Sequence, residues 1–467
     1  MNKLKALEQK IKDIKAASKN IREYLNDILD EKSFVETDVY LSGSSYIDDK
    51  EVSGEGVITG YASIGGRPVY LFAQNYDVLK GSFSKAQGDK IIKTINQAVK
   101  NSSPLIAVID SDGARVGEGV RVLEAYAAVI NALVIASDDI PVISVVKGNC
   151  SGLISALVAL SDFTLMSKDA SMSLAPPSVV LAKSNINGAL SENLGAKFHM
   201  SESGFSNSVY ENTKELKAKL SEILSVFDSD IINPADDPNR VSAALNKGIS
   251  VKTLLDALTD NGKFIPYSVD NAAELKLGFG QVNGIMCGIA ISDSSVSQHL
   301  TIQAIDKFNR FIELLDKFNI PLITLVDSAG IESSLIYERG GLAFNYANLM
   351  KSLSISSMAK VAVICGKAIG AAYSALAAKS IGYDYVLAFA GAEVSPVDAQ
   401  VAVNLLYTDE IKNSKDPVAA RKKIESRYSE EGADALIAAR EGYIDNVIEP
   451  AALRPYVSSA LLMLLNL

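Results

Sequence analysis

The chain of 467 residues contains one pattern twice, and this repeat constrains its fold more than any other feature. The apolar run PLIAVID begins at Pro104 and returns as PLITLVD at Pro321. The run PVISVVKGNCSG ends at Gly152, and its counterpart AKVAVICGKAIG ends at Gly370. The distance from Pro104 to Pro321 and the distance from Gly152 to Gly370 therefore differ by a single residue. A spacing kept so closely over such a distance indicates a tandem duplication of one fold.

Each copy has the element order of an α/β domain whose sheet is covered on both faces. Short runs of β-forming residues come first, then a segment with helical periodicity, and then a buried strand. A chain of this length also exceeds one ordinary hydrophobic core. We therefore predict two domains, 1–230 and 231–467. The predicted elements are the strands 56–64 and 67–74, the helix 84–101 and the strand at 104–120, and then 278–293, 301–319 and 321–331 in the second copy.

Three further segments lie outside the repeated pattern. Apolar residues spaced by three and four from Leu4 to Ile28 predict an amphipathic helix interrupted at Ser18, packed on its own domain or on a neighbouring subunit. The polar stretch 197–265 is predicted to be a linker with one or two helices. The charged stretch 408–440 is predicted to be a solvated helix.

The composition excludes several classes of protein. A net charge of -10 argues against a general nucleic-acid surface. We find no uninterrupted apolar run of membrane-spanning length and no signal-peptide pattern, and therefore expect a cytoplasmic protein. The cysteines Cys150, Cys287 and Cys365 stand in apolar surroundings, as small core residues of a reducing compartment do. His199 and His299 lack the spacing of a zinc site or a catalytic triad, so we expect no metal site.

The repeated strands each run into small residues and then a helix, first at Gly152 and again at Gly370. The first turn of a helix carries unpaired N–H groups and partial positive charge. Glycine or alanine there lets a ligand oxygen approach the backbone, and two converging N–H groups form an oxyanion hole without a catalytic side chain. For one such glycine alone, close packing of helix against strand is the better explanation, but two such turns in register favour a ligand site.

Three side chains near these turns have alternative interpretations. Asp162 fits a structural cap or turn better than a catalytic acid. Arg115 suits a phosphate or carboxylate ligand, and it suits a structural ion pair at least as well. Tyr373 fits packing or a pocket wall better than proton donation.

These motifs resemble the carboxyltransferase subunits of biotin-dependent acyl-CoA carboxylases and decarboxylases, such as the β subunit of propionyl-CoA carboxylase and methylmalonyl-CoA carboxyltransferase. The resemblance implies a tandem duplication of the crotonase/ClpP-like (ββα) superhelix fold. It rests on motifs in a common order along nearly the whole chain: LDEKSFVETD, GEGVITGYASIGGRPVYLFAQ, DSDGARVGEG, GNCSGLISALVALSDFTLM, LGAKFHMSESG, DDPNR, NGKFIPYSV, GFGQVNG, FNIPLITLVDSAG, KAIGAAY and AAREGYIDNVIEP.

The resemblance implies that acyl-CoA binds the N-terminal domain and carboxybiotin the C-terminal domain of a partner subunit. The thioester oxygen would accept hydrogen bonds from the N–H groups of Gly152 and Leu153. The ureido oxygen would accept them from the N–H groups around Gly370, Ala371 and Ala372. Biotin would supply the base for the acyl α-proton. The remaining ligand contacts implied are Gly113, Ala114, Arg115, Ser151, Gly330, Gly340, Gly341, Tyr373 and Ser374.

The sequence also departs from the family pattern. Leu153 stands where the family has a second glycine, and Asp112 replaces a glycine of the DSGGAR motif. Ala329 lies within the altered TPG motif, and Ser374 replaces an aspartate found in many acyl-CoA carboxylases. Backbone donors survive these changes, whereas pocket size and charge do not, so the acyl preference cannot be transferred.

The resemblance leaves three functions open. The first is a carboxyltransferase that acts on a short-chain acyl-CoA, and the second is the corresponding subunit of a decarboxylase complex. The third is a non-catalytic structural or regulatory homologue, which Leu153 and Asp112 motivate. No Met-Lys-Met biotinylation motif occurs. Biotin is therefore expected on a separate carrier protein, with biotin carboxylase or decarboxylase subunits as further partners and a dimer-built homohexamer as the assembly.

Overall fold

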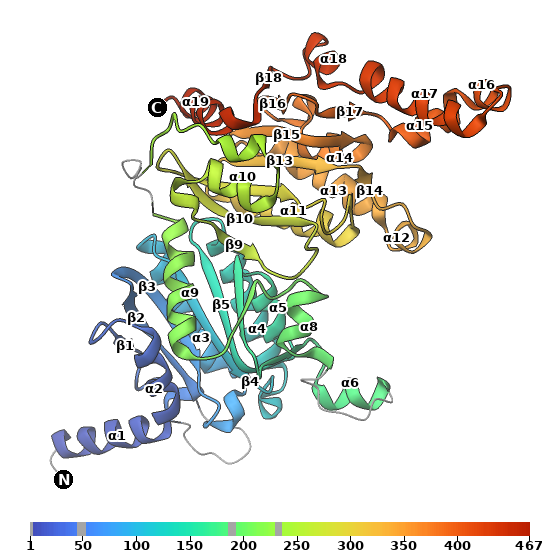
Figure 1. Cartoon of the computed structure of the whole chain (residues 1–467). Coiled ribbons are helices and arrows are strands. Elements are labelled where there is room, and N and C mark those ends of the chain that lie inside the picture. The colour runs from blue at the N-terminus through green and yellow to red at the C-terminus, as the bar shows by residue number, and fades with distance from the viewer. Residues whose placement is uncertain (1–2, 44–52, 185–192, 229–235) are drawn as a thin grey trace. The chain divides into compact units, whose positions relative to one another are not determined.

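The computed structural model describes residues 3–43, 53–184, 193–228 and 236–467. The chain forms two compact units, Met1–Asp228 and Ser229–Leu467. The predicted boundary between residues 230 and 231 falls outside the described residues. Each unit is built around its own eight-stranded sheet (Figure 1).

The first sheet has the strand order β1-β2-β3-β4-β5-β6-β8, with β7 paired to β5. Its first three strands are antiparallel, and the remaining neighbours run parallel. The strands are β1 (Val35–Thr37), β2 (Val57–Ile64), β3 (Arg67–Gln74), β4 (Leu105–Ser111), β5 (Val142–Ser151), β6 (Phe163–Ser167), β7 (Ser171–Ser173) and β8 (Ser208–Tyr210).

The second sheet repeats this arrangement strand by strand. Its order is β9-β10-β11-β13-β15-β16-β18, with β17 paired to β15, and the same neighbours are antiparallel or parallel. The predicted duplication of an α/β fold is therefore confirmed. The strands are β9 (Ile265–Ser268), β10 (Leu275–Val282), β11 (Ile285–Ser292), β13 (Leu322–Ser328), β15 (Lys360–Ile369), β16 (Tyr385–Phe389), β17 (Glu393–Ser395) and β18 (Asn446–Ile448).

Helices cover the parallel part of each sheet, because the crossover between parallel strands needs a long connection. The predicted helices 84–101 and 301–319 are confirmed as α3 and α11. The helices of the first unit are α1 (Lys3–Ala17), α2 (Lys19–Ile28), α3 (Lys85–Lys100), α4 (Val120–Ser137), α5 (Ile154–Ala159), α6 (Pro177–Ser184), α8 (Ala196–Ser201) and α9 (Thr213–Val226). Those of the second are α10 (Val251–Leu258), α11 (Ile302–Lys317), α12 (Leu335–Arg339), α13 (Leu342–Ile355), α14 (Gly370–Leu376), α15 (Ala399–Leu406), α16 (Thr408–Lys412), α17 (Pro417–Gly432), α18 (Ala435–Arg440) and α19 (Leu453–Leu465).

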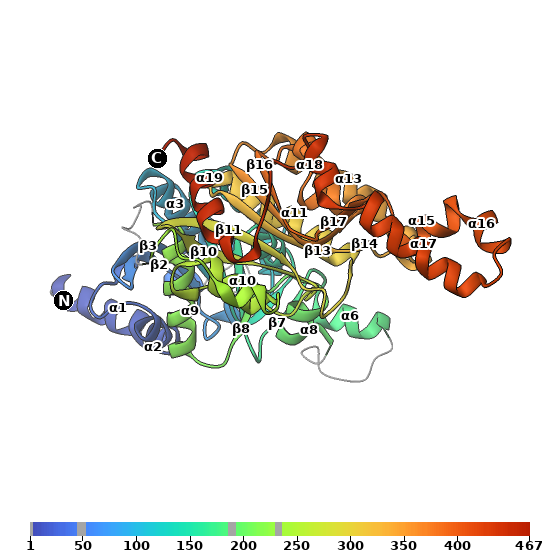
Figure 2. The same cartoon turned by 45° about the horizontal axis from the view of Figure 1, so that its top comes forward.

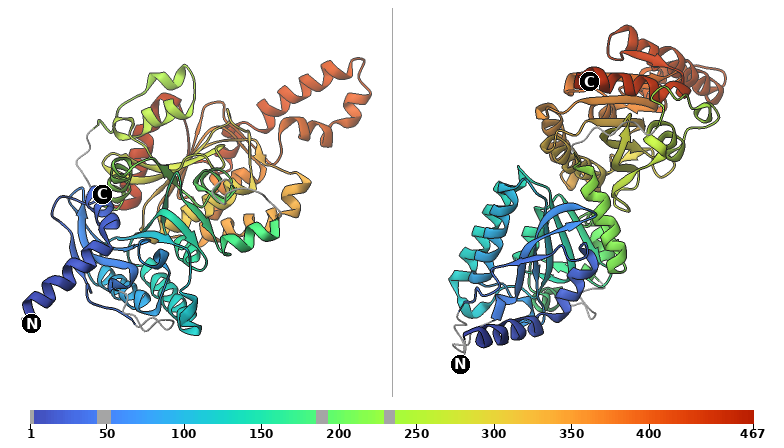
Figure 3. Two further views of the ribbon diagram at one scale, coloured as in Figure 1. Left: turned by 90° about the horizontal axis from the view of Figure 1, so that it is seen from below. Right: turned by 90° about the vertical axis from the view of Figure 1, so that its left-hand side faces the viewer.

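The segments outside the repeat fit the predictions in part. The N-terminal helix breaks at Ser18, as expected, and α1 extends away from the first unit with only Ile14 buried (Figures 1 and 3). The charged stretch 408–440 forms three helices, α16, α17 and α18. Two of these helices, α16 and α17, project from the second unit beside α15 (Figure 2). The prediction of a linker over 197–265 is wrong in part, because this stretch contributes β8 to the first sheet and helices to both units.

A reciprocal clamp fixes the start of the central parallel strand in each unit. The Asp162 carboxylate accepts the N–H of Val142 at 2.7 Å, and the Asp162 N–H donates to the Val142 carbonyl at 2.9 Å. Asp384 and Lys360 make the same pair of bonds, at 2.8 Å and 2.9 Å. Asp162 therefore has the structural role that the sequence favoured.

A buried lysine ties the crossover helix to the antiparallel hairpin in each unit. Lys307 of α11 donates to the carbonyls of Asn271, Ala272 and Leu275 at 2.5–2.8 Å. Lys90 of α3, at the equivalent position of the first unit, donates to Val57 O at 2.6 Å. Burial lowers the pKa of Lys307 to about 7 and that of Lys90 to about 8.

Helix α4 is long and apolar enough to span a membrane, by length and composition alone. In this structure it packs on α3, and Tyr126 at its centre stacks on Phe83 with ring centroids 4.0 Å apart. A third of the helix is buried inside the unit. One face of α4 therefore packs on α3, and apolar side chains such as Val120 and Ile135 stay exposed on the other.

Replacing Lys307 by methionine is expected to lower the free energy of unfolding by about 3 kcal/mol, since it removes the ammonium donor that three carbonyls share. Chemical denaturation of the full chain measures the change. Lys252→Met, at an exposed position of α10 in the same unit, is the control and should change stability little. Equal stability of the two variants would contradict a structural role for Lys307.

Candidate functional site

The first turn, defined here as Cys150–Leu153, connects the end of β5 to the start of α5. Gly152 has φ +80°, a conformation that favours glycine. Its N–H donates to Ser173 O at 2.9 Å and so extends the ladder between β5 and β7. This bond revises the sequence interpretation, because the Gly152 N–H is already paired. The Leu153 N–H has no partner in the described part of the chain, and the Leu153 side chain is 38% exposed.

A second backbone segment, Ser111–Arg115, approaches the first turn from the end of β4. Gly113 has φ +111°, and its N–H donates to Ser111 Oγ at 3.1 Å. Phe83 donates its N–H to Gly113 O and accepts the N–H of Arg115, both at 2.8 Å. These bonds leave the Ala114 N–H without a partner among the described residues. An added Cβ on Gly152 would lie 3.8 Å from the Gly113 Cα, which shows how closely the two segments approach.

The second turn, defined here as Ala368–Ala371, occupies the equivalent place in the second unit. Helix α14 begins at Gly370, which has φ +54°, so the N–H groups of Gly370, Ala371 and Ala372 lie in its first turn. Gly330 repeats the geometry of Gly113, with φ +136° and its N–H donated to Ser328 Oγ at 3.4 Å. Both predicted turns therefore exist, each beside a glycine-containing loop of its own unit.

Arg115 is buried in an ion pair. Its guanidinium lies 2.8 Å from the Glu55 carboxylate and 3.3 Å from that of Glu118. Glu55 is fully buried and also accepts the hydroxyl of Ser84 at 3.0 Å. The sequence left open whether Arg115 binds a ligand or forms a structural ion pair. In the structure its guanidinium forms the ion pair and so already has a carboxylate partner.

The Asp112 carboxylate lies beside the first turn and is held by three donors. The Asn149 amide donates to it at 2.7 Å and the Tyr76 hydroxyl at 3.2 Å, and the Lys80 ammonium lies 3.6 Å away. The charge expected here is therefore present, but a cation and two hydrogen bonds offset part of it.

Polar side chains also surround the second turn. The Tyr346 hydroxyl donates to Ala371 O at 3.0 Å. Lys367, just before the turn, pairs with Asp398 at 3.0 Å. Although burial opposes it, hydrogen bonds from the Gln400 N–H and from Lys367 hold the pKa of Asp398 below its usual range.

The other predicted contacts lie in the second unit at varying positions. Tyr373 and Ser374 follow the turn within α14, where burial raises the pKa of Tyr373. Gly340 and Gly341 connect α12 to α13, and Gly341 has φ +88°. Gly340 donates its N–H to Ile336 O at 2.9 Å, which is a helix-ending bond. In the first unit, Ser151 is buried at the end of β5.

Sequence reasoning gave no role to Asp110 and Asp327, the next-to-last residues of β4 and β13. The Asp110 carboxylate accepts the Asn149 N–H, and Asp327 accepts the Lys367 N–H, each one residue before a turn. Their recurrence at equivalent positions of the two copies was the available signal. Sequence alone did not show that both carboxylates point at the neighbouring strand.

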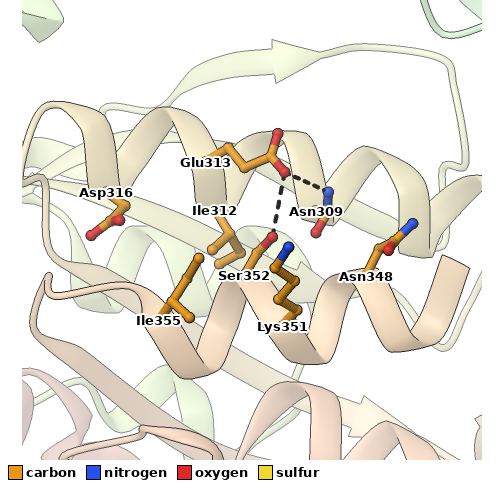
Figure 4. Close-up of a pocket in the computed structure, with 8 residues that line it drawn as sticks. All are labelled: Asn309, Ile312, Glu313, Asp316, Asn348, Lys351, Ser352 and Ile355. Carbon is orange, nitrogen blue, oxygen red and sulfur yellow. Dashed lines mark hydrogen bonds between the residues drawn. The ribbon is translucent and has the colours of Figure 1, made fainter. Parts of the chain in front are cut away.

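A pocket of about 280 Å³ lies in the groove between α11 and α13 of the second unit (Figure 4). Asn309 and Ser352 donate hydrogen bonds to Glu313 in its wall, and none of the predicted site residues lines it. Within the described ranges, no three His, Cys, Asp or Glu side chains are placed to hold a metal ion.

Comparison with known proteins connects this geometry to a family. The model of the carboxyl transferase domain matches residues 12–466. The chain is 32% identical over 462 residues to the carboxyltransferase subunit of propionyl-CoA carboxylase from Haloferax mediterranei, covering 95% of this chain and 90% of that protein. It is 33% identical over 463 residues to the methylmalonyl-CoA decarboxylase subunit alpha from Veillonella parvula, covering 95% and 89%.

A solved structure gives the same result. The chain resembles the transcarboxylase 12S hexamer with methylmalonyl-CoA and methylmalonic acid bound, with a TM-score of 0.92 and 30% identity over 99% of this chain and 95% of that one. The 12S subunit of methylmalonyl-CoA carboxyltransferase from Propionibacterium freudenreichii subsp. shermanii is 32% identical over 95% of this chain and 88% of its own length. The duplicated crotonase-like sheets, the paired turns and the match over nearly the whole sequence together make this chain a member of the carboxyl transferase domain family.

Proposed function

We propose that the protein is an enzyme that moves a carboxyl group between carboxybiotin on a carrier protein and a short-chain acyl-CoA. The observation that carries the proposal is the pair of equivalent turns, one in each unit, in a chain 30% identical to a structure that holds methylmalonyl-CoA. Two sites of one design suit a reaction in which two carbonyl oxygens are stabilised in the same way.

The first turn receives the thioester oxygen of acyl-CoA. Because the Gly152 N–H is paired with Ser173, the donors are the N–H groups of Leu153 and Ala114, which have no other described partner. Both groups belong to rigid segments, since β5 and the Phe83 bridge hold their backbones. Hydrogen bonds of this kind stabilise the negative charge that develops when the α-proton leaves.

The second turn receives the ureido oxygen of biotin through the first N–H groups of α14. The residues present fit that group, because Gly370 leaves the backbone open and Tyr346 anchors the Ala371 carbonyl. Biotin, when bound, supplies the carboxyl group and the base. The chain contributes orientation and backbone donors.

The proposed partners are a biotin carboxyl carrier protein, biotin carboxylase or decarboxylase subunits, and further copies of the chain in a dimer-built hexamer. Exposed apolar side chains on equivalent helices of the two units support association: Val120, Leu123 and Ile135 on α4, and Phe344 and Ile355 on α13. The buried free cysteines support a cytoplasmic location.

A second candidate is the reverse reaction, as the carboxyltransferase subunit of a decarboxylase complex. The 33% identity to a methylmalonyl-CoA decarboxylase subunit favours it as much as the carboxylase relatives favour the forward reaction. Partner subunits set the direction, and both candidates use the same turns.

Replacing Gly370 by valine is expected to abolish biotin-dependent turnover while CoA binding survives. The new Cβ would meet Pro396 O at 3.0 Å and close the backbone approach. Turnover with free biotin and calorimetric titration with CoA measure the two effects. Gly391→Val, which has similar backbone strain at φ +87° but open space around it, is the control. Unchanged turnover in Gly370→Val would remove the second turn from the reaction.

The acyl preference is testable with malonyl-, methylmalonyl- and glutaconyl-CoA as carboxyl donors to free biotin. We expect activity on malonyl- or methylmalonyl-CoA. Activity on glutaconyl-CoA alone would overturn the proposal that the substrate carries a short saturated acyl group. An intact oligomer that neither binds acyl-CoA nor supports exchange would make the chain a structural or regulatory subunit.

Shortening Leu153 to alanine should raise kcat/KM for methylmalonyl-CoA relative to malonyl-CoA by about tenfold, since a smaller side chain admits the extra methyl group. Leu160→Ala is the matched control, because Leu160 ends the same helix with 40% exposure. A ratio unchanged in both variants would show that the Leu153 side chain does not contact the acyl group.

A further inference from the structure

The strand next to each turn-bearing strand has an aspartate as its next-to-last residue. Asp110 lies at this position of β4, beside β5, and Asp327 lies at this position of β13, beside β15. In both ladders the register shifts at this point, between Ile109 and Ser111 and between Val326 and Ser328. Each aspartate therefore occupies an interruption of the backbone pairing.

In the first unit the carboxylate replaces the missing backbone bond. Asp110 Oδ1 accepts the N–H of Asn149 at 3.2 Å, and Oδ2 accepts Lys147 Nζ at 2.7 Å. Gly148 lies against it so closely that an added Cβ would come within 2.4 Å of Oδ1. Only glycine fits beside this carboxylate.

The second unit repeats the arrangement with a different outer partner. Asp327 Oδ1 accepts the N–H of Lys367 at 2.9 Å, and Oδ2 accepts the hydroxyl of Ser294 at 2.6 Å. A Cβ on Gly366 would come within 2.3 Å of Oδ1. Both units therefore share two features, the hydrogen bond that the carboxylate accepts from a backbone N–H and the glycine packed against that carboxylate.

The N–H that each carboxylate holds precedes a turn by one residue. Asn149 leads into Cys150, the first residue of the first turn, and Lys367 leads into Ala368, the first of the second. On the other side, β7 and β17 pair with the same residues of β5 and β15. Each strand is therefore held from two sides where it delivers the turn.

We propose that Asp110 and Asp327 are positioning residues that set the two turns for oxygen binding through this hydrogen bond. The proposal rests on the function proposed above. A negative charge near a site for a developing oxyanion opposes its stabilisation, so the useful contribution is the acceptor oxygen and not the charge. Misplacing a turn by about 1 Å costs about 100-fold in rate.

The second unit offers the sharper test. Asp327→Ala is expected to lower kcat about 100-fold with the KM for acyl-CoA unchanged. Asp327→Asn should restore kcat to within about tenfold of the wild type, because its oxygen still accepts the Lys367 N–H and its NH₂ can donate to Ser294. Asp110→Asn is a poorer choice, since its NH₂ would face the Lys147 ammonium.

Asp384→Ala is the matched control, because Asp384 also accepts a backbone N–H of β15. It removes a carboxylate that accepts the Lys360 N–H at the far end of β15, and should lower the melting temperature without lowering kcat. An equal loss of kcat in Asp384→Ala and Asp327→Ala, or a loss in Asp327→Asn as deep as in Asp327→Ala, would overturn the proposal.

Amide hydrogen exchange gives a readout independent of turnover. In Asp327→Ala, peptides covering 368–372 should exchange faster than in the wild type, whereas Asp384→Ala should affect the start of β15 only. Unchanged exchange in Asp327→Ala would reject the positioning role even if the wild type lacked carboxyl transfer. Absence of transfer in the wild type, with faster exchange in Asp327→Ala, would reject only the proposed function.

Discussion

A carboxylate packed against a glycine is the contact on which each half of this protein depends. Asp110 against Gly148 and Asp327 against Gly366 leave no space for a side chain on the neighbouring strand. The same contact falls where the backbone ladder is interrupted, so the carboxylate supplies the acceptor that the adjacent strand lacks. The strands emerge beyond it with their last residues fixed, and the helices that follow begin there.

The duplication conserves backbone geometry more closely than side chains. Every strand of the first sheet has an equivalent in the second, and the clamps at Asp162 and Asp384 share their bonds. Around this scaffold the side chains diverge, since Lys147 pairs with Asp110 whereas Ser294 serves Asp327. Chemistry that rests on N–H groups tolerates such divergence, and one fold can thereby serve two different ligands.

The sequence predicted what depends on local pattern and on the repeat. The crossover helices, the buried strands, the break at Ser18 and the positions of both turns followed from periodicity and spacing. Hydrogen bonds between segments far apart in the chain could not be predicted from the sequence. The pairing of Arg115 with Glu55 joins segments far apart in the chain, and the bond from Gly152 to Ser173 requires knowing that β7 joins β5. The strand β8 was missed because three residues in a polar stretch carry no usable alternation.

Cys150 gives the first turn a consequence for chemical inhibition. Its thiol is fully buried within the turn, and burial raises its pKa well above the ordinary value. An electrophile that captures thiolates therefore has no reactive group to modify there. Inhibitors of the thioester site proposed at this turn have to imitate the charge distribution of the reacting thioester. Their selectivity among related enzymes has to come from the neighbouring side chains, of which Leu153 is the most exposed in the turn.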